Sequence, residues 1–401
     1  MNIGRIVLKS LRQHLLSTVV TAGSIALAGG LLISVWVVKS QANKTFTQIE
    51  GGFDAVLGAR SSQLQLVLNS IFHLESSPGN IEWQDFLDIK SDPNVALAVP
   101  ISVGDNYRGY RIVGTTPEMF SQNEFAPGQK YEIAGKGNFF EPGYQEAVVG
   151  SFVAQKLKLK PGDEFHPYHG VNFNEEHEHD EDYVVVGILK PSNTPSDRVI
   201  WIPLEGLQNM SGHIEEASTQ VSAVLVKFKS PIAGKMLQSK YNQQDSRLTL
   251  AWPIGTIMAQ LLDKVSWFDR VLALVAYLVA IVAAASILAS IYNSMNERRR
   301  EIAILRALGA RRHTIFFSVV LEAMTISALG MCIAFAVYVV LLMGVAQIIR
   351  AQTGVVLDPL AFHPVMVFAP LGIIALSALA GIVPAFKAYR TDVAANLVPN
   401  S

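Results

Sequence analysis

Four long runs of the sequence carry almost no charge, and they constrain the fold more than any other feature. They cover residues 15–38, 271–292, 314–349 and 365–386, and Glu322 is the one acidic or basic residue inside them. Each run reaches the roughly 20 apolar residues that a helix needs to cross a bilayer. Buried helices of a large soluble protein are the alternative, but uncharged runs of this length are rare outside membranes. The sequence therefore predicts four transmembrane helices.

Charged residues flank these runs unevenly and orient the predicted helices. The segments before the first run, between the second and third runs, and after the fourth run hold 11 Lys and Arg residues against three Asp and Glu. Residues 40–269 hold 18 basic and 28 acidic residues. Short basic loops stay in the cytoplasm, whereas a long domain is translocated despite its charges. We therefore expect a multi-pass membrane protein with both termini in the cytoplasm.

The first run predicts an uncleaved anchor. Its 24 uncharged residues exceed the apolar core of about 7–15 residues that a cleavable signal peptide has. The segment before it has apolar residues at helical spacing, which suits a helix on the membrane surface. The predicted parts are an amphipathic helix at 1–14, transmembrane helices at 15–40, 270–295 and 314–349, an extracytoplasmic domain at 41–269, a cytoplasmic loop at 296–313, and the fourth transmembrane helix with a tail at 365–401.

The predicted extracytoplasmic domain reads as a mixture of strands and helices. "VALAVPISV" and "YVVVGILK" are typical of strands, while "IEWQDFLDIK" has helical spacing. The one cysteine, Cys332, lies in the third apolar run, so the domain has no disulfide and depends on its core. About 230 residues are enough for such a core. The predicted fold class is a membrane protein with four transmembrane helices and a large α+β domain between the first and second.

The loop "NERRREIAILRALGARRHT", residues 296–314, combines six arginines with an apolar helical face. Ile302, Leu305 and Leu308 can share that face, and Gly309 can end the helix with a positive φ. A short amphipathic helix of this kind can dock in a groove on a cytosolic partner. The alternative is that the arginines only hold the loop on the cytoplasmic side.

Several motifs together make the chain resemble the MacB-type ABC transporter permeases, which include the lipoprotein-releasing permeases and FtsX-like proteins. "ERRREIAILRALGA" resembles the family's loop after the second span, and "GIVPAFKAYRTDVAANL" resembles its C-terminal signature. "VVGSFVAQKLKLKPGDEF" and "YVVVGILKPSNTPSDRVIWIPLEGL" are similar to motifs of its external domain. The likeness covers nearly the whole chain, and the order of one span, an external domain and three spans is also the family's order.

The resemblance implies a role for the loop and for Glu322. In the family this loop contacts the nucleotide-binding subunit, and an acid often stands where Glu322 does. Glu322 lies eight residues into the third run, about 12 Å along a helix, which favours helix packing or coupling over proton transport. The residues expected to couple this chain to the ATPase subunit are Glu297, Arg298, Arg300, Glu301, Ile302, Leu305, Arg306, Leu308 and Gly309.

The sequence contains no ATPase motif of its own. It has no G-x-x-x-x-G-K-[ST] phosphate loop, and neither H-E-x-x-H nor G-x-S-x-G is present, so we expect no enzyme activity from this chain. ATP and Mg²⁺ are then expected on a separate cytosolic ABC ATPase subunit. The resemblance also implies a bacterial cytoplasmic (inner) membrane, and a second permease copy as a homodimer or a heterodimer. Beyond membrane lipid, a periplasmic or extracellular binding partner is expected, and no nucleic acid.

The resemblance leaves two kinds of function open. The first is transport or mechanotransmission, in which ATP hydrolysis changes the shape of the external domain and moves a peptide, lipid or lipoprotein. The alternative is an FtsX-like regulatory module that activates an extracytoplasmic partner enzyme without transport.

The segment "FHPYHGVNFNEEHEHDEDY", residues 165–183, favours a different cargo. It holds four of the nine histidines among six acidic residues. Neutral imidazole and carboxylate groups suit zinc, copper or nickel, although a solvated acidic loop with chance histidines is the simpler interpretation. A transition metal, zinc above all, is therefore a second candidate cargo. The candidate ligands are His166, His169, His177, His179, Asp180 and Asp182.

Overall fold

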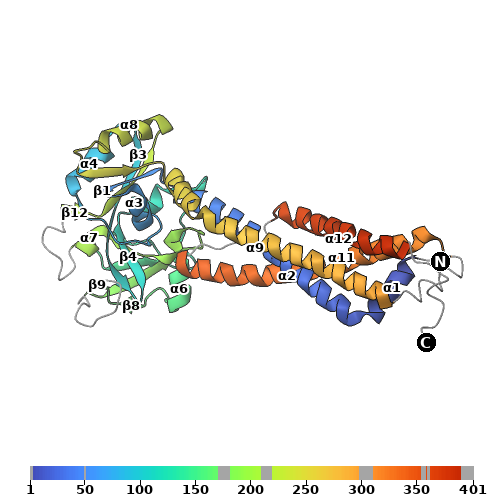
Figure 1. Ribbon diagram of the computed structural model, residues 1–401. Helices are drawn as coiled ribbons and strands as arrows, with labels where there is room; N and C mark the ends of the chain where they lie inside the picture. The colour runs from blue at the N-terminus through green and yellow to red at the C-terminus, as the bar shows by residue number, and fades with distance from the viewer. Residues whose placement is uncertain are drawn as a thin grey trace. The chain divides into compact units, whose positions relative to one another are not determined.

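The computed structural model describes residues 3–48, 51–169, 181–208, 219–297, 310–353, 358 and 362–389 (Figure 1). The chain divides into two compact units. The first, here called the helical unit, comprises Met1–Gln41, Val265–Ala346 and Asp358–Ser401. The second, here called the α+β domain, comprises Ala42–Lys264 and Gln347–Leu357.

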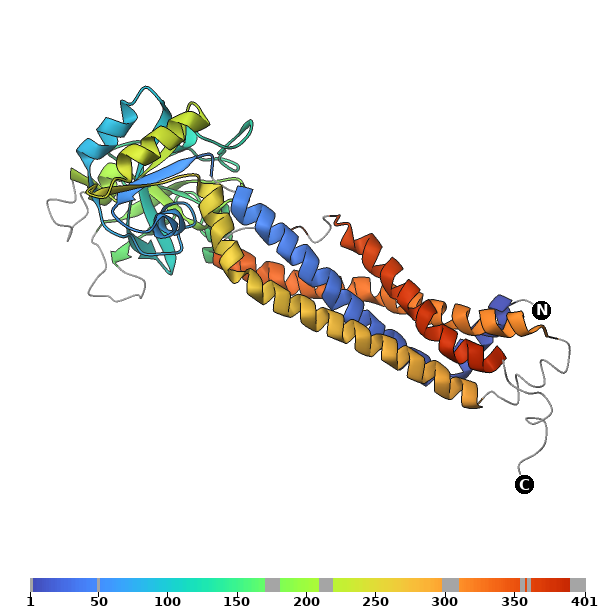
Figure 2. The same cartoon turned by 45° about the horizontal axis from the view of Figure 1, so that its top comes forward.

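Long helices make up the helical unit. Among the described residues, three are long and apolar enough to cross a membrane: Leu15–Gln41, Arg312–Gln352 and Val365–Phe386. The second predicted span lies within one unbroken helix, and its membrane crossing stays a prediction. The helices are α1 Ile3–Gln13, α2 Leu15–Gln48, α9 Ile254–Glu297, α11 Arg312–Thr353 and α12 Val365–Tyr389 (Figure 2).

Helix α11 is longer than the sequence suggested. It has 42 residues, which is about 60 Å at the rise of an α-helix, twice the roughly 30 Å of a hydrocarbon core. From Gln347 onward its residues group with the α+β domain. There the Arg350 Nη2 atom donates a hydrogen bond of 2.9 Å to Gln155 Oε1. The apolar run ends at 349, so the spacing of apolar residues gave no sign that the helix continues onto the domain.

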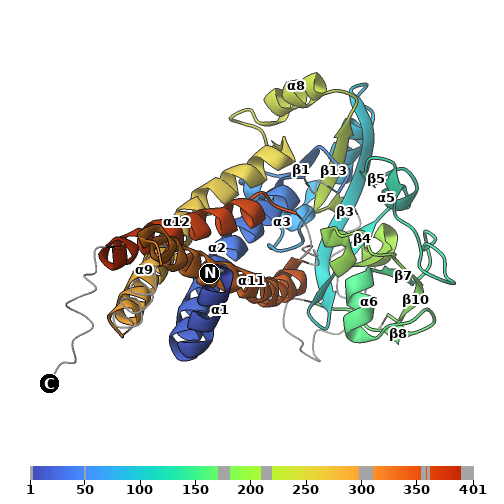
Figure 3. The ribbon, with the colours of Figure 1, turned by 90° about the vertical axis from the view of Figure 1, so that its right-hand side faces the viewer.

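The α+β domain is built on one mixed sheet of ten strands. The order is β14-β1-β13-β3-β4-β11-β7-β10-β8, with β9 beside β3. Neighbours pair antiparallel except β10 with β7 and β11 with β4, which are parallel. Figure 3 shows β1, β13, β3 and β4 side by side. The strands are β1 Ala55–Ala59, β3 Val95–Tyr107, β4 Tyr110–Thr115, β7 Glu146–Val149, β8 Glu164–Phe165, β9 Tyr168–His169, β10 Tyr183–Ile188, β11 Ile200–Pro203, β13 Ala223–Phe228 and β14 Leu248–Ala251.

The central strands are buried on both faces. Because successive side chains of a strand point to opposite faces, Leu225 joins the core on one side, whereas Val224 and Val226 join the core on the other. Helix α3 and the first turns of α9 cover the first face, and α4 and α8 cover the second. These strands are therefore rich in valine and leucine instead of alternating with polar residues.

Short elements complete the domain. Two small sheets pair β2 Ile81–Glu82 with β12 Gln220–Val221, and β5 Glu124–Ala126 with β6 Gln129–Lys130. The helices are α3 Gln63–Ser70, α4 Trp83–Lys90, α5 Glu118–Ser121, α6 Ser151–Leu157, α7 Leu204–Gln208 and α8 Pro231–Tyr241, with a 3₁₀ turn at Pro195–Arg198.

Candidate functional site

Most of the predicted coupling loop lies outside the described residues. Glu297 is the last residue of α9, and Arg312 is the first of α11. The other eight predicted contact residues fall in 298–309, of which the structure says nothing. The loop's role toward an ATPase therefore stays a prediction.

Aromatic and basic side chains gather where α11 begins and α12 ends. The Arg312 guanidinium carbon lies 5.7 Å from the centroid of the Tyr389 ring, a cation–π distance. The His313 ring centroid lies 5.9 Å from the same ring. The start of α11, next to the predicted loop, thus packs against the end of α12.

Glu322 is a buried carboxylate on α11. Its residue is 9% exposed, and one of its oxygens accepts a hydrogen bond from Ser10 Oγ of α1. Ser10 shares the buried face of α1 with Val7 and Leu11, at the three- and four-residue steps of a helix. The hydrogen bond therefore joins the amphipathic N-terminal helix to the third predicted span. Sequence reasoning singled out Glu322 for packing or coupling but missed Ser10, whose position on the apolar face of α1 was the available signal.

The histidine segment is described only in part. His177, His179 and Asp180 lie outside the described residues. His166 Nε2 lies 3.1 Å from Asp182 Oδ1, an exposed ion pair when the imidazole is protonated. His166 and His169 do not share a helical turn, because β8 ends at Phe165 and Tyr168–His169 pairs with β3 as β9. Within the described residues no three His, Cys, Asp or Glu side chains are grouped for a metal ion.

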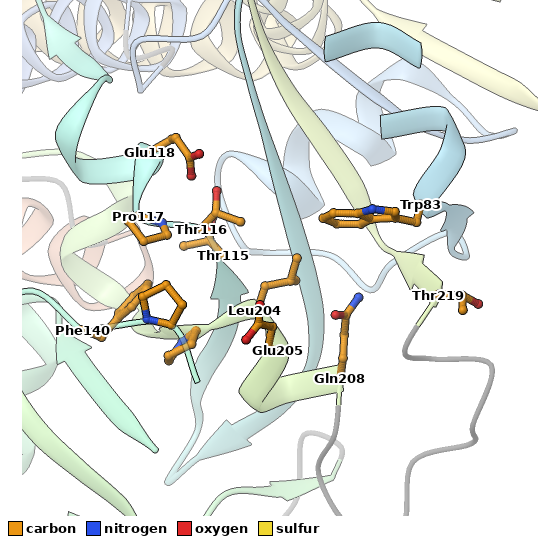
Figure 4. A pocket seen from close by; sticks show the side chains of 12 residues that line it. Trp83, Thr115, Thr116, Pro117, Glu118, Phe140, Leu204, Glu205, Gln208 and Thr219 are labelled. Atoms are coloured by element: carbon orange, nitrogen blue, oxygen red, sulfur yellow. The ribbon is translucent and has the colours of Figure 1, made fainter. Parts of the chain in front are cut away.

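The α+β domain contains a pocket of about 410 Å³ between α4 and α7. Figure 4 shows Trp83 of α4 across from the turn after β4 and from α7. Its polar groups are the carboxylates of Glu118 and Glu205, the amide of Gln208 and the hydroxyls of Thr115, Thr116 and Thr219, and Leu204 is among its apolar ones. No sequence motif marks this pocket, because its lining comes from five separate segments between Trp83 and Thr219.

A second pocket of about 480 Å³ lies between residues 72–77, the β3–β4 hairpin and the end of α11. Arg111 of β4, Arg198 of the 3₁₀ turn and Gln352 of α11 all line it. Arg198 Nη1 donates a hydrogen bond to the Gln352 carbonyl oxygen. Arg111 Nη1 reaches the Asn69 carbonyl oxygen at 3.5 Å. The domain thus holds the last turns of α11 through a pocket lined by two guanidinium groups.

The 3₁₀ turn positions Arg198 through the residue before it. The Asp197 carboxylate accepts hydrogen bonds from the backbone N–H groups of Ser192 and Asn193 at 2.9–3.1 Å. Burial is the main cause that raises the pKa of this carboxyl, and these hydrogen bonds oppose the rise. The bonds fix the loop 192–197 and so fix the direction in which Arg198 leaves it.

His73, on the wall of the second pocket, is held in its neutral form. Burial, with the nearby Arg111 and Arg198 charges, lowers the pKa of its imidazole to about 3. Its backbone has a φ of 55°, in the left-handed region, and its ring meets Trp201 edge-on at a centroid distance of 5.7 Å. A side chain in this uncommon backbone conformation is held by its surroundings.

Two parts of the chain match models of known protein families. Residues 18–243 match the family model of the MacB-like periplasmic core domain, and residues 273–393 match that of the FtsX-like permease C-terminal region. The chain belongs to the MacB/FtsX-like family of ABC transporter permeases. The resemblance seen in its motifs is confirmed.

Two solved structures are similar to the external part of this permease. The extracellular domain of the noncanonic ABC-type transporter YknZ from Gram-positive bacteria is 17% identical over 49% of this chain and 97% of its own, with a TM-score of 0.29. The periplasmic region of MacB from Actinobacillus actinomycetemcomitans is 10% identical over 55% of this chain and 98% of its own, with a TM-score of 0.35. MacB/FtsX-like permeases work with ABC ATPase partners. The Glu322–Ser10 contact and the two pockets are features of this permease that its motifs did not reveal.

Proposed function

We propose that this chain is a permease subunit that couples ATP hydrolysis by a separate cytosolic ATPase to a change in the shape of its α+β domain. Binding of ATP by that partner would push the loop 296–313. The connected helices would carry the displacement to the domain on the other side of the membrane.

One observation supports this coupling above all. Helix α11 begins at Arg312, directly after the loop, and continues without a break to Thr353. Its last turns are held on the α+β domain by Arg350 to Gln155 and by Arg198 to Gln352. A continuous helix is stiff over this length, so a push at one end would reach the other.

The test is loss of ATPase binding when the loop's apolar face is charged. Leu305→Glu in the full chain, expressed in its own host and isolated in mild detergent, should no longer retain an ABC ATPase that the unaltered chain retains. Ile232→Glu is the matched control, because Ile232 is an exposed apolar residue of α8, 74% accessible. Normal ATPase retention by Leu305→Glu, with normal membrane insertion, would contradict the docking role.

The cargo we propose first is a peptide, lipid or lipoprotein. The pocket between α4 and α7 supports an amphiphilic cargo, because it sets the indole of Trp83 and apolar side chains beside two carboxylates. Pockets that bind small molecules are mostly apolar with a few placed polar groups. Transport assays on reconstituted permease and ATPase, with and without Trp83→Ala, would test that use of the pocket.

A transition metal is the second cargo candidate. The observation in its favour is the 3.1 Å approach of His166 to Asp182, since a carboxylate commonly orients a histidine ligand. Zinc titration of the full chain should show tight binding that is lost when His166, His169, His177 and His179 are all replaced by alanine. Unchanged zinc affinity in that variant would remove the metal cargo and leave the ATPase coupling untouched.

The alternative function, regulation of a partner enzyme, makes a different prediction for the full chain isolated in mild detergent. An FtsX-like activator would retain a cell-wall hydrolase through its α+β domain and stimulate it when ATP is hydrolysed. Activity of a co-purified hydrolase that rises with ATP, in the absence of any transported cargo, would favour regulation over transport.

A further inference from the structure

The pocket at the end of α11 has an unusual set of charges. Two guanidinium groups, from Arg111 and Arg198, line it, and Asp105 of β3 is the one acidic residue of its lining. His73 contributes no charge near neutral pH, for the reason given above. Arginine stays protonated in proteins, so the lining carries one net positive charge. Glu75 lies close enough to Arg111 to act on it electrostatically, but it is exposed and does not line the pocket.

Two buried polar atoms in the same pocket lack a hydrogen-bond partner among the described residues. They are the Nε atom of Arg198 and the Nδ1 atom of His73. Buried polar atoms in native proteins are paired as a rule, and each exception needs an explanation. A bound group with acceptor atoms would supply the partner that Arg198 lacks.

Apolar side chains line the pocket beside these charges. Phe72, Leu74, Val103 and Tyr110 all contribute to its wall. Its volume of about 480 Å³ lies within the usual range of small-molecule sites. One net positive charge next to an apolar wall complements a molecule with one negative charge and an apolar body.

We propose that this pocket binds the anionic head of an amphiphile, a carboxylate or a phosphodiester, between Arg111 and Arg198. Arg198 also holds the Gln352 carbonyl oxygen. The ligand would therefore complete a network that fastens the last turn of α11 to the α+β domain. The site is separate from the pocket between α4 and α7, and its occupancy does not depend on the proposed coupling to an ATPase.

The experiment measures binding of defined probes to the full chain in phosphatidylcholine nanodiscs. Octanoate and octanamide have the same apolar body and differ in charge, so calorimetric titration should give octanoate at least tenfold tighter binding. Dihexanoyl-phosphatidylglycerol provides the phosphodiester arm, and whichever anion binds more tightly identifies the head group. Hydrogen exchange of residues 345–353 should slow when the better probe is bound.

Variants then place the probe in the pocket. Arg111→Gln and Arg198→Gln should each weaken octanoate binding at least tenfold. Arg108→Gln should not, because Arg108 makes the same charge change on the adjoining exposed turn without lining the pocket. Ser76→Asp adds a negative charge to the exposed rim, and Ser76 makes no hydrogen bond within the described part of the chain, so this variant tests the site even when an arginine variant fails to fold.

Each possible result of these binding measurements either supports the proposed site or contradicts it. Weaker binding in the Arg111, Arg198 and Ser76 variants, with normal binding in Arg108→Gln, supports the site. Equal affinity for octanoate and octanamide, equal loss in all variants including Arg108→Gln, or no binding of either anion would overturn it. Loss of ATPase retention plays no part in these readouts, so failure of the proposed function leaves the test intact.

Discussion

At the scale of the residue, Glu322 shows how a carboxylate is accommodated in an apolar helix. A buried charge costs free energy unless hydrogen bonds compensate it. Ser10 on α1 supplies one of those bonds. The residue thus serves as an anchor for the amphipathic helix, and a purely apolar residue at 322 would leave α1 without this attachment.

Removing the donor should cost measurable stability. Ser10→Ala takes one hydrogen bond from a buried carboxylate, and such losses cost about 1–3 kcal/mol. The melting temperature of the full chain in detergent should fall. Thr325→Ala is the control, because the Thr325 hydroxyl is exposed and bonds only within its own helix, to the Leu321 carbonyl oxygen. A drop no larger than that of the control would mean that the Ser10 bond contributes nothing.

His73 should make the α+β domain sensitive to acid. Its pKa is about 3 in the folded protein and about 6.5 in an unfolded chain, so the unfolded state takes up the proton first as the pH falls. Folding stability from this group is complete above about pH 6.5 and is lost progressively toward about pH 3.

The measurement compares the fall in melting temperature between about pH 7 and about pH 4 in three proteins. His73→Asn, which keeps a residue that tolerates a positive φ, should show a smaller fall than the unaltered chain. His166→Asn removes an exposed histidine and should show the same fall as the unaltered chain. An unchanged fall in His73→Asn would mean that carboxyl groups alone cause the acid sensitivity.

At the scale of the element, α2 and α11 approach each other closely at small residues. A Cβ atom on Gly30 would lie 2.7 Å from Val337 Cγ1 and 2.9 Å from the Ala334 carbonyl oxygen. Real Cβ contacts are never this short, and a backbone oxygen cannot swing aside as a long side chain can. Small residues at helix interfaces in membranes allow this kind of approach.

Enlarging Gly30 should therefore loosen the helix pair. Gly30→Ala is expected to destabilise the protein by about 1–3 kcal/mol through overpacking, seen as a lower melting temperature. Gly372→Ala on α12 is the matched control, because nothing lies within 4 Å of its added Cβ. That change should be neutral or slightly stabilising, since alanine favours a helix by up to about 1 kcal/mol over glycine. Equal behaviour of the two variants would contradict close packing at Gly30.

The helices and strands predicted correctly were those whose apolar residues recur at the spacing of a helix or a strand. The strand β3 and the helix α4 both fall where spacing placed them. The order of the strands in the sheet could not be predicted from the sequence. Strand β1 pairs with β13 across more than 160 residues, and no local pattern determines such a partner. The last turns of α11 and the two pockets were also missed, since Gln352 and Arg198 meet only in the folded chain.

At the scale of the whole molecule, three helices run from the helical unit into the α+β domain. Helix α2 continues past Gln41 to Gln48, and α9 begins at Ile254, before the helical unit resumes at Val265. Helix α11 adds a third connection, and its end is fastened by side chains of the domain.

The orientation on which this coupling depends can be tested in intact cells. In a Cys332→Ala background, Lys235→Cys on α8 should react with a membrane-impermeant maleimide applied from outside, because Lys235 is an exposed residue of the α+β domain. Arg311→Cys, exposed beside the start of α11, should react only after the cells are permeabilised, since short arginine-rich loops are retained in the cytoplasm. For a chain housed in a Gram-negative envelope, the outer membrane is first made leaky to the reagent. Labelling of Arg311→Cys from outside, or protection of Lys235→Cys until permeabilisation, would place the loop away from any cytosolic ATPase and rule out the proposed coupling.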